Sequence, residues 1–140
     1  MKKWMTAALL VLFAATAFAQ KNQGTVFEKG TLKELLALAD EQDKYLFVDV
    51  YATWCGPCQM MHPVIDRFQE KMNGRVDVYK VDIDDRDMLE IVHRYNIMSV
   101  PTLMFFRRGE VLWRESGRIG YDHLANVLRE LEQREQVGQR

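Results

Sequence analysis

The chain's two cysteines stand where an apolar run gives way to a helical pattern, and this junction constrains the fold more than any other feature. The run, KYLFVDVYA at residues 44–52, is rich in β-branched and aromatic residues and is interrupted inside only by Asp49. Such a run is typical of a strand buried on both faces. Cys55 and Cys58 follow directly and enclose one glycine and one proline. Because proline suits a first helical turn, we expect a central strand that passes straight into a helix.

The remaining chain alternates between helical and strand patterns. Thr31 and Glu34 form a capping-box pattern, which predicts a helix over 31–42. Strands that alternate with helices imply parallel pairing, whereas a final hairpin adds antiparallel strands. We therefore expect an α/β fold with a mixed central sheet, parallel strands plus a C-terminal antiparallel hairpin, flanked by helices. The further elements expected are a short strand near Val26, a helix over 59–74, a strand over 75–84, a helix over 86–96, strands over 101–106 and 110–115, and a last helix over 120–133.

The amino terminus has the layout of a secretory signal peptide. Lys2 and Lys3 precede an apolar stretch that ends in the small-x-small pattern AFA at residues 17–19. We expect cleavage near Ala19 and export to the periplasm; the alternative is an uncleaved N-terminus that anchors the chain in the membrane, facing that compartment. Only 16 residues run from Trp4 to Ala19, whereas a spanning helix needs about 20. The organisation expected is a cleaved signal peptide at 1–19, a lead-in at 20–30, one domain at 31–134 and a polar, fraying tail at 135–140.

Charge and length exclude several classes of function. Loss of Lys2 and Lys3 from 19 basic residues leaves 17 against 20 acidic ones, a formal net charge of −3. No basic patch stands out, so nucleic acid is not expected as a partner. The 121 residues after Ala19 suffice for one buried core and contain no apolar run of membrane-spanning length. We expect a soluble monomer once the signal peptide is removed.

The cysteine pair has three interpretations. A purely structural disulfide across four residues closes almost no chain, so it stabilises far less than the roughly 3 kcal/mol expected for a 15-residue loop. A structural zinc site needs four ligands, but the chain has no second Cys-x-x-Cys, and His62, His93 and His123 are scattered. A reversible redox pair needs one nucleophilic thiolate and a second thiol within reach. A helix N-terminus at Cys55 favours the thiolate, and Cys58 falls one turn along, so the redox interpretation is favoured.

Three segments in this order resemble the signature segments of the thioredoxin family: VDVYATWCGPCQMMHP, YKVDID and YNIMSVPTLMFFRRGE. The resemblance runs from about Val26 to Leu131. A WCGPC pattern joined to a downstream valine-proline-threonine is far more specific than Cys-x-x-Cys alone. The resemblance implies a thioredoxin fold and an enzyme that exchanges thiols and disulfides.

By this resemblance, Cys55 is the exposed attacking cysteine and Cys58 the buried resolving one. Trp54 flanks the pair and covers part of the site; the alternative is an aromatic core residue. Asp49 and Lys80 match the family's acid beneath the resolving thiol and its neighbouring lysine. The residues alone favour a solvent-facing acid in this strand, because a buried carboxylate is costly unless it is paired or protonated. With the resemblance, we expect Asp49 to have a raised pKa and to take the proton from Cys58.

The implied substrate-binding surface lies around the pair. Pro101 matches the family's cis-proline facing the cysteines, and the backbone of Val100 is implied to pair with a bound peptide. Gly56 leaves the backbone beside the attacking cysteine uncrowded, and Pro57 fits the first helical turn. Gly117 matches a glycine that lets the nearby surface lie flat, although ordinary turn chemistry is its first interpretation.

Some positions depart from the family's pattern. Gln59 stands where many members carry a lysine, and His62 stands where a small residue is common. We interpret His62 as a solvated helix residue. Pro63 matches the proline that kinks the active-site helix.

The function expected is that of an exported protein-disulfide reductase. The Gly-Pro link resembles reducing members, whereas oxidases of the DsbA type carry a histidine there and a helical insertion for which this chain is too short. No cofactor is implied, neither metal, flavin nor nucleotide. The expected partners are disulfide-containing exported proteins and a membrane thiol carrier of the DsbD or CcdA type. The alternatives are a periplasmic disulfide oxidase or isomerase on the same fold, and a thioredoxin-fold peptide-binding module that grips peptides at Val100 and Pro101 without the thiols.

Overall fold

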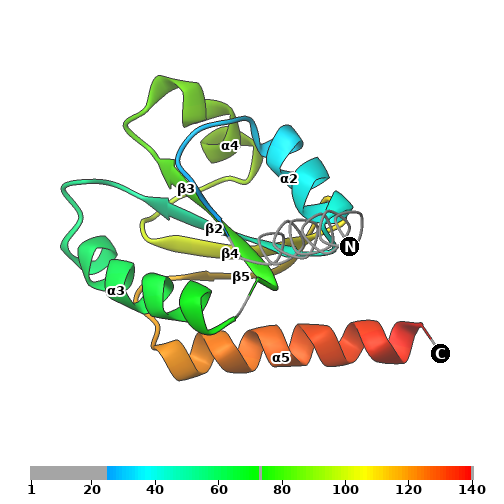
Figure 1. Ribbon diagram of the computed structural model, residues 1–140. Helices are drawn as coiled ribbons and strands as arrows, with labels where there is room; N and C mark the ends of the chain where they lie inside the picture. The colour runs from blue at the N-terminus through cyan, green and yellow to red at the C-terminus, as the bar shows by residue number, and fades with distance from the viewer. Residues whose placement is uncertain (1–24, 73, 140) are drawn as a thin grey trace, which may run out of the picture.

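The apolar run around Asp49 forms the central strand of a five-stranded sheet in a computed structural model that describes residues 25–72 and 74–139 (Figure 1). β2 (Tyr45–Tyr51) pairs in parallel with β3 (Val76–Asp82) and antiparallel with β4 (Thr102–Arg107). The strand order is β1-β3-β2-β4-β5, with β1 (Val26–Phe27) and β5 (Glu110–Ser116) at the edges. β5 runs antiparallel to β4. The expected mixed sheet, with parallel strands and a C-terminal hairpin, is therefore confirmed.

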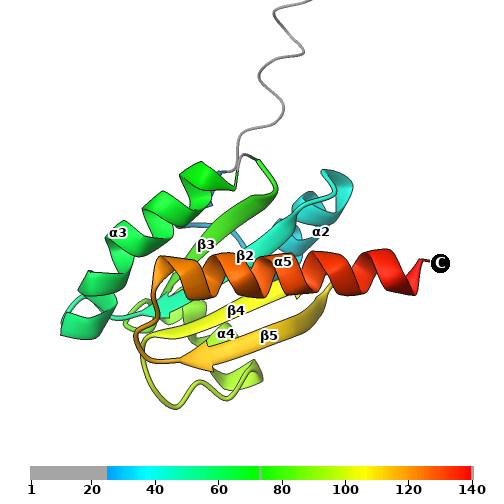
Figure 2. The ribbon, with the colours of Figure 1, turned by 90° about the horizontal axis from the view of Figure 1, so that it is seen from below.

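Helices cover both faces of this sheet. α3 (Gly56–Lys71) and α5 (Tyr121–Gly138) lie on one face, as Figure 2 shows, and α2 (Leu32–Glu41) and α4 (Leu89–Arg94) lie on the other. Each face has its own apolar core. Phe47, Phe68 and Phe105 pack together under α3 and α5, with ring centroids 4.9–5.9 Å apart. The opposite core is built around Tyr79, Met104 and Phe106.

Local signals explain where most elements begin. The capping box of α2 is present: the Thr31 side chain accepts from the Glu34 N–H, and the Glu34 carboxylate accepts from the Thr31 N–H. α3 begins at Gly56 with Cys55 as its N-cap, so the helix start expected at the cysteine pair is confirmed, and the helical pattern over 59–74 forms the rest of a helix that ends at Lys71. The single helix expected over 86–96 is instead a 3₁₀ turn, η1 (Arg86–Met88), followed by α4.

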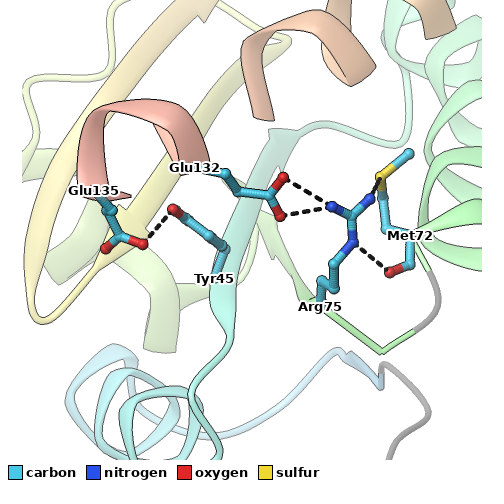
Figure 3. Close-up of polar contacts among 5 residues, drawn as sticks. All are labelled: Tyr45, Met72, Arg75, Glu132 and Glu135. Carbon is cyan, nitrogen blue, oxygen red and sulfur yellow. Dashed lines mark hydrogen bonds and ion pairs between the residues drawn. The ribbon is translucent and has the colours of Figure 1, made fainter. Parts of the chain in front are cut away.

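The carboxyl end of the chain corrects an expectation. The polar tail was expected to fray after a helix over 120–133, but α5 continues to Gly138. Glu135, inside that tail, accepts a hydrogen bond from the Tyr45 hydroxyl at 2.7 Å (Figure 3). It accepts a second one from Arg107 Nε at 3.0 Å. These long-range partners hold the last turns of the helix against the sheet.

The signal peptide expected at 1–19 lies outside the described residues, as does the first part of the lead-in at 20–30. The rest of that lead-in contributes β1, which pairs in parallel with β3. Within the two described ranges, no helix combines the length and the apolar composition needed to cross a membrane.

Candidate active site

Cys55 and Cys58 form a disulfide at the junction between β2 and α3, with their Cα atoms 5.2 Å apart. Cys55 is the N-cap of α3, and its sulfur accepts a hydrogen bond from the Cys58 N–H at 3.2 Å. Pro57 lies in the first helical turn, where its missing N–H costs little. The strand-to-helix junction therefore aims a backbone N–H, and the positive end of a 16-residue helix, at the Cys55 sulfur.

The two cysteines differ in exposure, but less than expected. Cys55 is 6% exposed and Cys58 is 1% exposed. The order agrees with an attacking and a resolving cysteine, yet the expectation of an exposed Cys55 is wrong for the disulfide form. Cys55 packs with Ala52 and Cys58, and Val100 covers this small cluster.

A second chain segment faces the pair from the start of β4. The Val100–Pro101 peptide bond is cis, as the resemblance implied. The Val100 carbonyl oxygen lies 3.8 Å from the Cys55 sulfur. The N–H of Gly117 donates to the Pro101 carbonyl at 2.9 Å, and Gly117 has a φ of +97°. This hydrogen bond ties the bend that follows β5 to the proline beside the cysteines.

Asp49 is buried on the face of β2 that α3 covers. It shares this face with Phe47 and Tyr45, two and four residues before it, which pack in the same cluster as Met61 and Ile65 of α3. Only 1% of Asp49 is exposed, so the solvent-facing alternative is wrong. Neither carboxylate oxygen has a hydrogen-bond partner among the described residues.

Burial raises the pKa of Asp49 to about 7, although the nearby Lys80 ammonium lowers it. Lys80 is the β3 residue directly opposite Asp49 in the parallel pair, and it is half-buried. The resemblance implied this pairing of acid and lysine, and the sheet register places the two residues side by side. A carboxyl with a pKa near 7 exchanges protons at neutral pH.

Trp54, which directly precedes Cys55, lies at the surface. It is 68% exposed, so the core alternative is wrong. Its indole Nε1–H donates to Asp84 Oδ2 at 2.8 Å. This bond connects the segment before Cys55 to the loop after β3 and fixes the ring beside the pair.

Gly56 has open space beside it, and Gln59 is hydrogen-bonded to the loop before α3. Apart from Gly56 itself, its two chain neighbours and the backbone of its own helix, no heavy atom of the described residues lies within 4 Å of the point where a Cβ on Gly56 would stand. The Gln59 side chain donates to the Thr53 carbonyl at 3.0 Å, which ties the first turn of α3 to the loop before it. The surface between the cysteines is thus open to an incoming chain.

His62 corrects another expectation, since it is half-buried rather than solvated. Its ring lies edge-on to Tyr51, with centroids 5.6 Å apart, and its Nδ1 atom has no partner in the described part of the chain. Sequence reasoning placed His62 on the helix but had no means of knowing that the end of β2 packs against it.

Sequence reasoning also missed Arg118 and Met60, which lie on either side of a groove next to Gly117. The Arg118 Nη1 atom is 3.0 Å from the Met60 sulfur. The one available signal was that Arg118 directly follows Gly117.

Within residues 25–72 and 74–139, no three histidine, cysteine or carboxylate side chains are grouped so that they hold a metal ion.

Comparison with known proteins agrees with this geometry. The Thioredoxin family model matches residues 26–130, three quarters of the chain. The chain is 39% identical to a thioredoxin of Rickettsia conorii over 103 residues, covering 74% of this chain and 90% of that one. It is 43% identical to a thioredoxin of Rickettsia felis over 88 residues, covering 63% and 79%.

A plant relative matches over a similar stretch. The chain is 33% identical over 101 residues to thioredoxin Y, chloroplastic, of Oryza sativa subsp. japonica, which covers 72% of this chain but only 59% of the rice protein. The matched region contains the cysteine pair, Asp49 and the cis-proline segment. The chain therefore belongs to the thioredoxin family, as a thiol–disulfide oxidoreductase whose Cys-x-x-Cys pair, Cys55 and Cys58, lies at disulfide distance.

Proposed function

We propose that the chain is an exported thioredoxin that reduces disulfides in client proteins of the same compartment. The observation that carries this proposal is the capped sulfur of Cys55. The Cys58 N–H points at that sulfur from 3.2 Å, and the N-terminal end of α3 adds its positive potential. Both favour the thiolate of reduced Cys55, which is the form that attacks disulfides.

The reaction proceeds in two exchanges. The Cys55 thiolate attacks one sulfur of a client disulfide, a Cys55–client bond forms, and the other client sulfur leaves as a thiolate that takes up a proton. The Cys58 thiol then loses its proton and attacks Cys55, so the Cys55–Cys58 disulfide forms and the second client sulfur leaves. Two electrons pass to the client, which ends as a dithiol. The disulfide seen in the structure corresponds to the oxidised product of this cycle.

Asp49 is the group suited to take the proton from Cys58. It faces the helix that carries Cys58, and its pKa of about 7 allows it to accept a proton near neutral pH. Asp49→Asn is expected to lengthen the lifetime of the Cys55–client mixed disulfide, measured by acid quenching during a single turnover. Resolution as fast as in the wild type would exclude this role.

The signal-peptide pattern at residues 1–19 supports an exported location. The N-terminal sequence of the protein purified from cells checks it: a chain that begins near Gln20 is expected, and a chain that retains residues 1–19 would favour the membrane-anchored form. An exported reductase is separated from NADPH-driven recycling, so it needs electrons from a membrane thiol carrier of the DsbD or CcdA type. In cells that lack every such carrier, we expect the Cys55–Cys58 pair to stay oxidised; a reduced pair would contradict this partner.

The reduction potential of the pair tests the proposed direction. Thioredoxin itself has a potential of about −270 mV, whereas protein disulfide isomerase stands at about −180 mV. Equilibration of the mature protein with a reference dithiol is expected to give a value close to that of thioredoxin. A value at or above that of protein disulfide isomerase would make the chain an oxidase or isomerase on the same fold.

A further inference from the structure

Arg118 stands on the rim of a groove beside the cysteine pair. The groove has a volume of about 270 Å³ and is lined by Met60, Met61, Val64, Arg118, Ile119 and Gly120. Met60 is 55% exposed, and its sulfur contacts Arg118 Nη1 at 3.0 Å. The Ile119 N–H lies 3.4 Å from the Met61 sulfur, which closes the floor of the groove.

The backbone ties this groove to the surface around the disulfide. Arg118 directly follows Gly117, whose N–H donates to the carbonyl of Pro101, the cis-proline next to Cys55. β5 runs in the same direction as β2 because each is antiparallel to β4. The carboxyl ends of β2 and β5 therefore lie on the same side of the sheet. They are two strand spacings apart, or roughly 10 Å. An extended peptide covers that distance in about three residues.

Charge is distributed unequally across this edge. β3 neighbours β2 on the side away from β5, and the loop after β3 carries Asp84, whose carboxylate accepts a hydrogen bond from the Trp54 indole. On the β5 side, Arg118 is exposed, and no carboxylate of residues 25–72 or 74–139 forms an ion pair with it. Glu115, the acid nearest before it in β5, is paired with His123 at 2.8 Å. Asp84 therefore lies on one flank of the cysteine pair and the unpaired cation of Arg118 on the other.

We propose that Arg118 and its groove select client segments with a glutamate about three residues from the attacked cysteine. A glutamate fits both parts of this surface: its methylene groups pack on Met60 and Ile119, and its carboxylate accepts from the remaining guanidinium N–H groups of Arg118. A lysine at the same point of the client meets an uncompensated cation. The inference rests on the proposed function, because it requires that a client chain lie across the disulfide.

Single-turnover oxidation of the reduced full-length chain by disulfide peptides tests this selection. The peptides are identical apart from Glu, Gln or Lys three residues from the reactive cysteine, placed in one series before it and in another after it. An exposed ion pair is worth about 0.2–1 kcal/mol, which corresponds to a rate up to about fivefold higher for Glu than for Gln at low salt. We expect this preference in at least one series, and we expect it to shrink as salt is added.

Charge variants assign the preference to Arg118. In R118Q the rates with Glu and Gln peptides are expected to become equal, and in R118E the order of Glu and Lys peptides is expected to reverse. R134E is the matched control. It makes the same charge change at an exposed position of α5, about 20 Å along the helix from its first residue, and is expected to keep the wild-type preference. A preference that is absent from both peptide series, or that survives in R118E, would overturn the inference.

One further probe separates this outcome from failure of the proposed function. Bis(2-hydroxyethyl) disulfide carries no charge and is too small to reach the groove from the cysteine pair. If the reduced wild type exchanges with this probe but shows no peptide preference, the selection by Arg118 is wrong and the thiol–disulfide chemistry stands. If the wild type exchanges with neither the probe nor the peptides, the proposed function itself fails, and the inference falls with it.

Discussion

At the scale of single residues, Asp49 links stability to pH. Its buried carboxyl has a pKa of about 7, whereas an ordinary aspartate has a pKa of 3.8. Between these values the native state holds a proton that the unfolded chain has lost, so the native state loses stability as pH rises from about 4 to 7. The cost at higher pH is on the order of 4 kcal/mol, at about 1.4 kcal/mol per pKa unit.

Asp49→Asn is therefore expected to raise the free energy of unfolding of the oxidised protein by about 2–4 kcal/mol at pH 8. At pH 4 and below the variant gains little, because both residues are then neutral. Denaturant unfolding at the two pH values measures the difference. Asp66→Asn, on the exposed side of α3, is the control and is expected to change stability by less than about 0.5 kcal/mol. Equal stability of Asp49→Asn and wild type at pH 8 would contradict the buried, raised-pKa carboxyl.

Gly117 is the other residue whose backbone bears on the site. Its φ of +97° lies outside the range that residues with a Cβ readily adopt. Apart from Gly117 and its two chain neighbours, no heavy atom of the described chain lies within 4 Å of the added Cβ position. Gly117→Ala is thus expected to destabilise the fold by about 1–2 kcal/mol through backbone strain alone. Gly138→Ala also enters open space, but at an ordinary φ in α5, and is expected to be neutral or slightly stabilising. Similar losses in both variants, measured by thermal unfolding, would show that backbone strain is not the cause.

Asp49 shows how far single residues can be interpreted from sequence. Its residue type within an apolar strand allowed either a solvent-facing or a buried group, and hydrophobicity alone favoured the former. Only the resemblance to a family indicated burial. The physical reason is that burial of this carboxyl depends on α3 packing over β2, a contact that the pattern within one strand does not contain.

At the scale of elements, the sequence predicted the sheet better than the ends of its helices. Strand and helix patterns follow local periodicity, and the strands expected over 101–106 and 110–115 appear as β4 and β5. The end of α5 is different. Residues after 133 look like a polar tail, but Glu135 is held by Tyr45 and Arg107, which are 90 and 28 residues away. No signal inside the tail indicates these partners.

The two carboxylates drawn in Figure 3 give a matched test of this end of α5. Glu135 pairs with Arg107, whose side chain is 9% exposed, whereas Glu132 pairs with Arg75, whose side chain is 51% exposed. Burial, and then the hydrogen bond to Glu135, raise the pKa of Tyr45, so its hydroxyl stays a donor at all ordinary pH values. Glu135→Gln removes one of the two carboxylates that pair with the buried Arg107 guanidinium. We expect it to lower the free energy of unfolding by about 1–3 kcal/mol.

Glu132→Gln removes only a solvent-screened pair and is expected to cost less than about 1 kcal/mol. Urea unfolding of the two variants, side by side with the wild type, measures both losses. Amide hydrogen exchange in residues 134–138 adds a local readout, since only Glu135→Gln is expected to loosen the last turns of α5. If Glu132→Gln were the more damaging change, the anchoring assigned to Glu135 would be wrong.

At the scale of the whole molecule, the site is a product of sheet topology. The cysteines follow β2, Asp84 follows β3 and Gly117 follows β5, and all three strands end at one edge because they run in the same direction. The order of elements along the chain predicted the fold class, and the resemblance supplied most site residues. The strand order that brings the end of β5 near the end of β2 is set by long-range pairing, so local patterns did not reveal the groove.

The same topology makes the short first strand important. β1 adds to the edge of β3, and the Thr25 N–H donates to the Asp77 carboxylate at 2.8 Å. Asp77 is 1% exposed and also pairs with Lys44 at 3.3 Å. Thr25 thus completes the hydrogen bonding of a buried ion pair, and its carbonyl accepts from the Val78 N–H at 2.8 Å.

Two shortened chains test this arrangement as a whole. A chain that begins at Gln20 keeps every contact of β1 and is expected to unfold reversibly with the fold described here. A chain that begins at Lys29 loses β1 and leaves the Asp77 carboxylate with one partner fewer in a buried position. It is expected to be less stable by about 2–4 kcal/mol, since an unsatisfied buried polar group costs about 1–3 kcal/mol and the half-buried Phe27 side chain adds its own burial. Guanidinium unfolding of the two oxidised chains measures the difference, and equal midpoints would show that β1 and Thr25 contribute nothing to the stability of the fold.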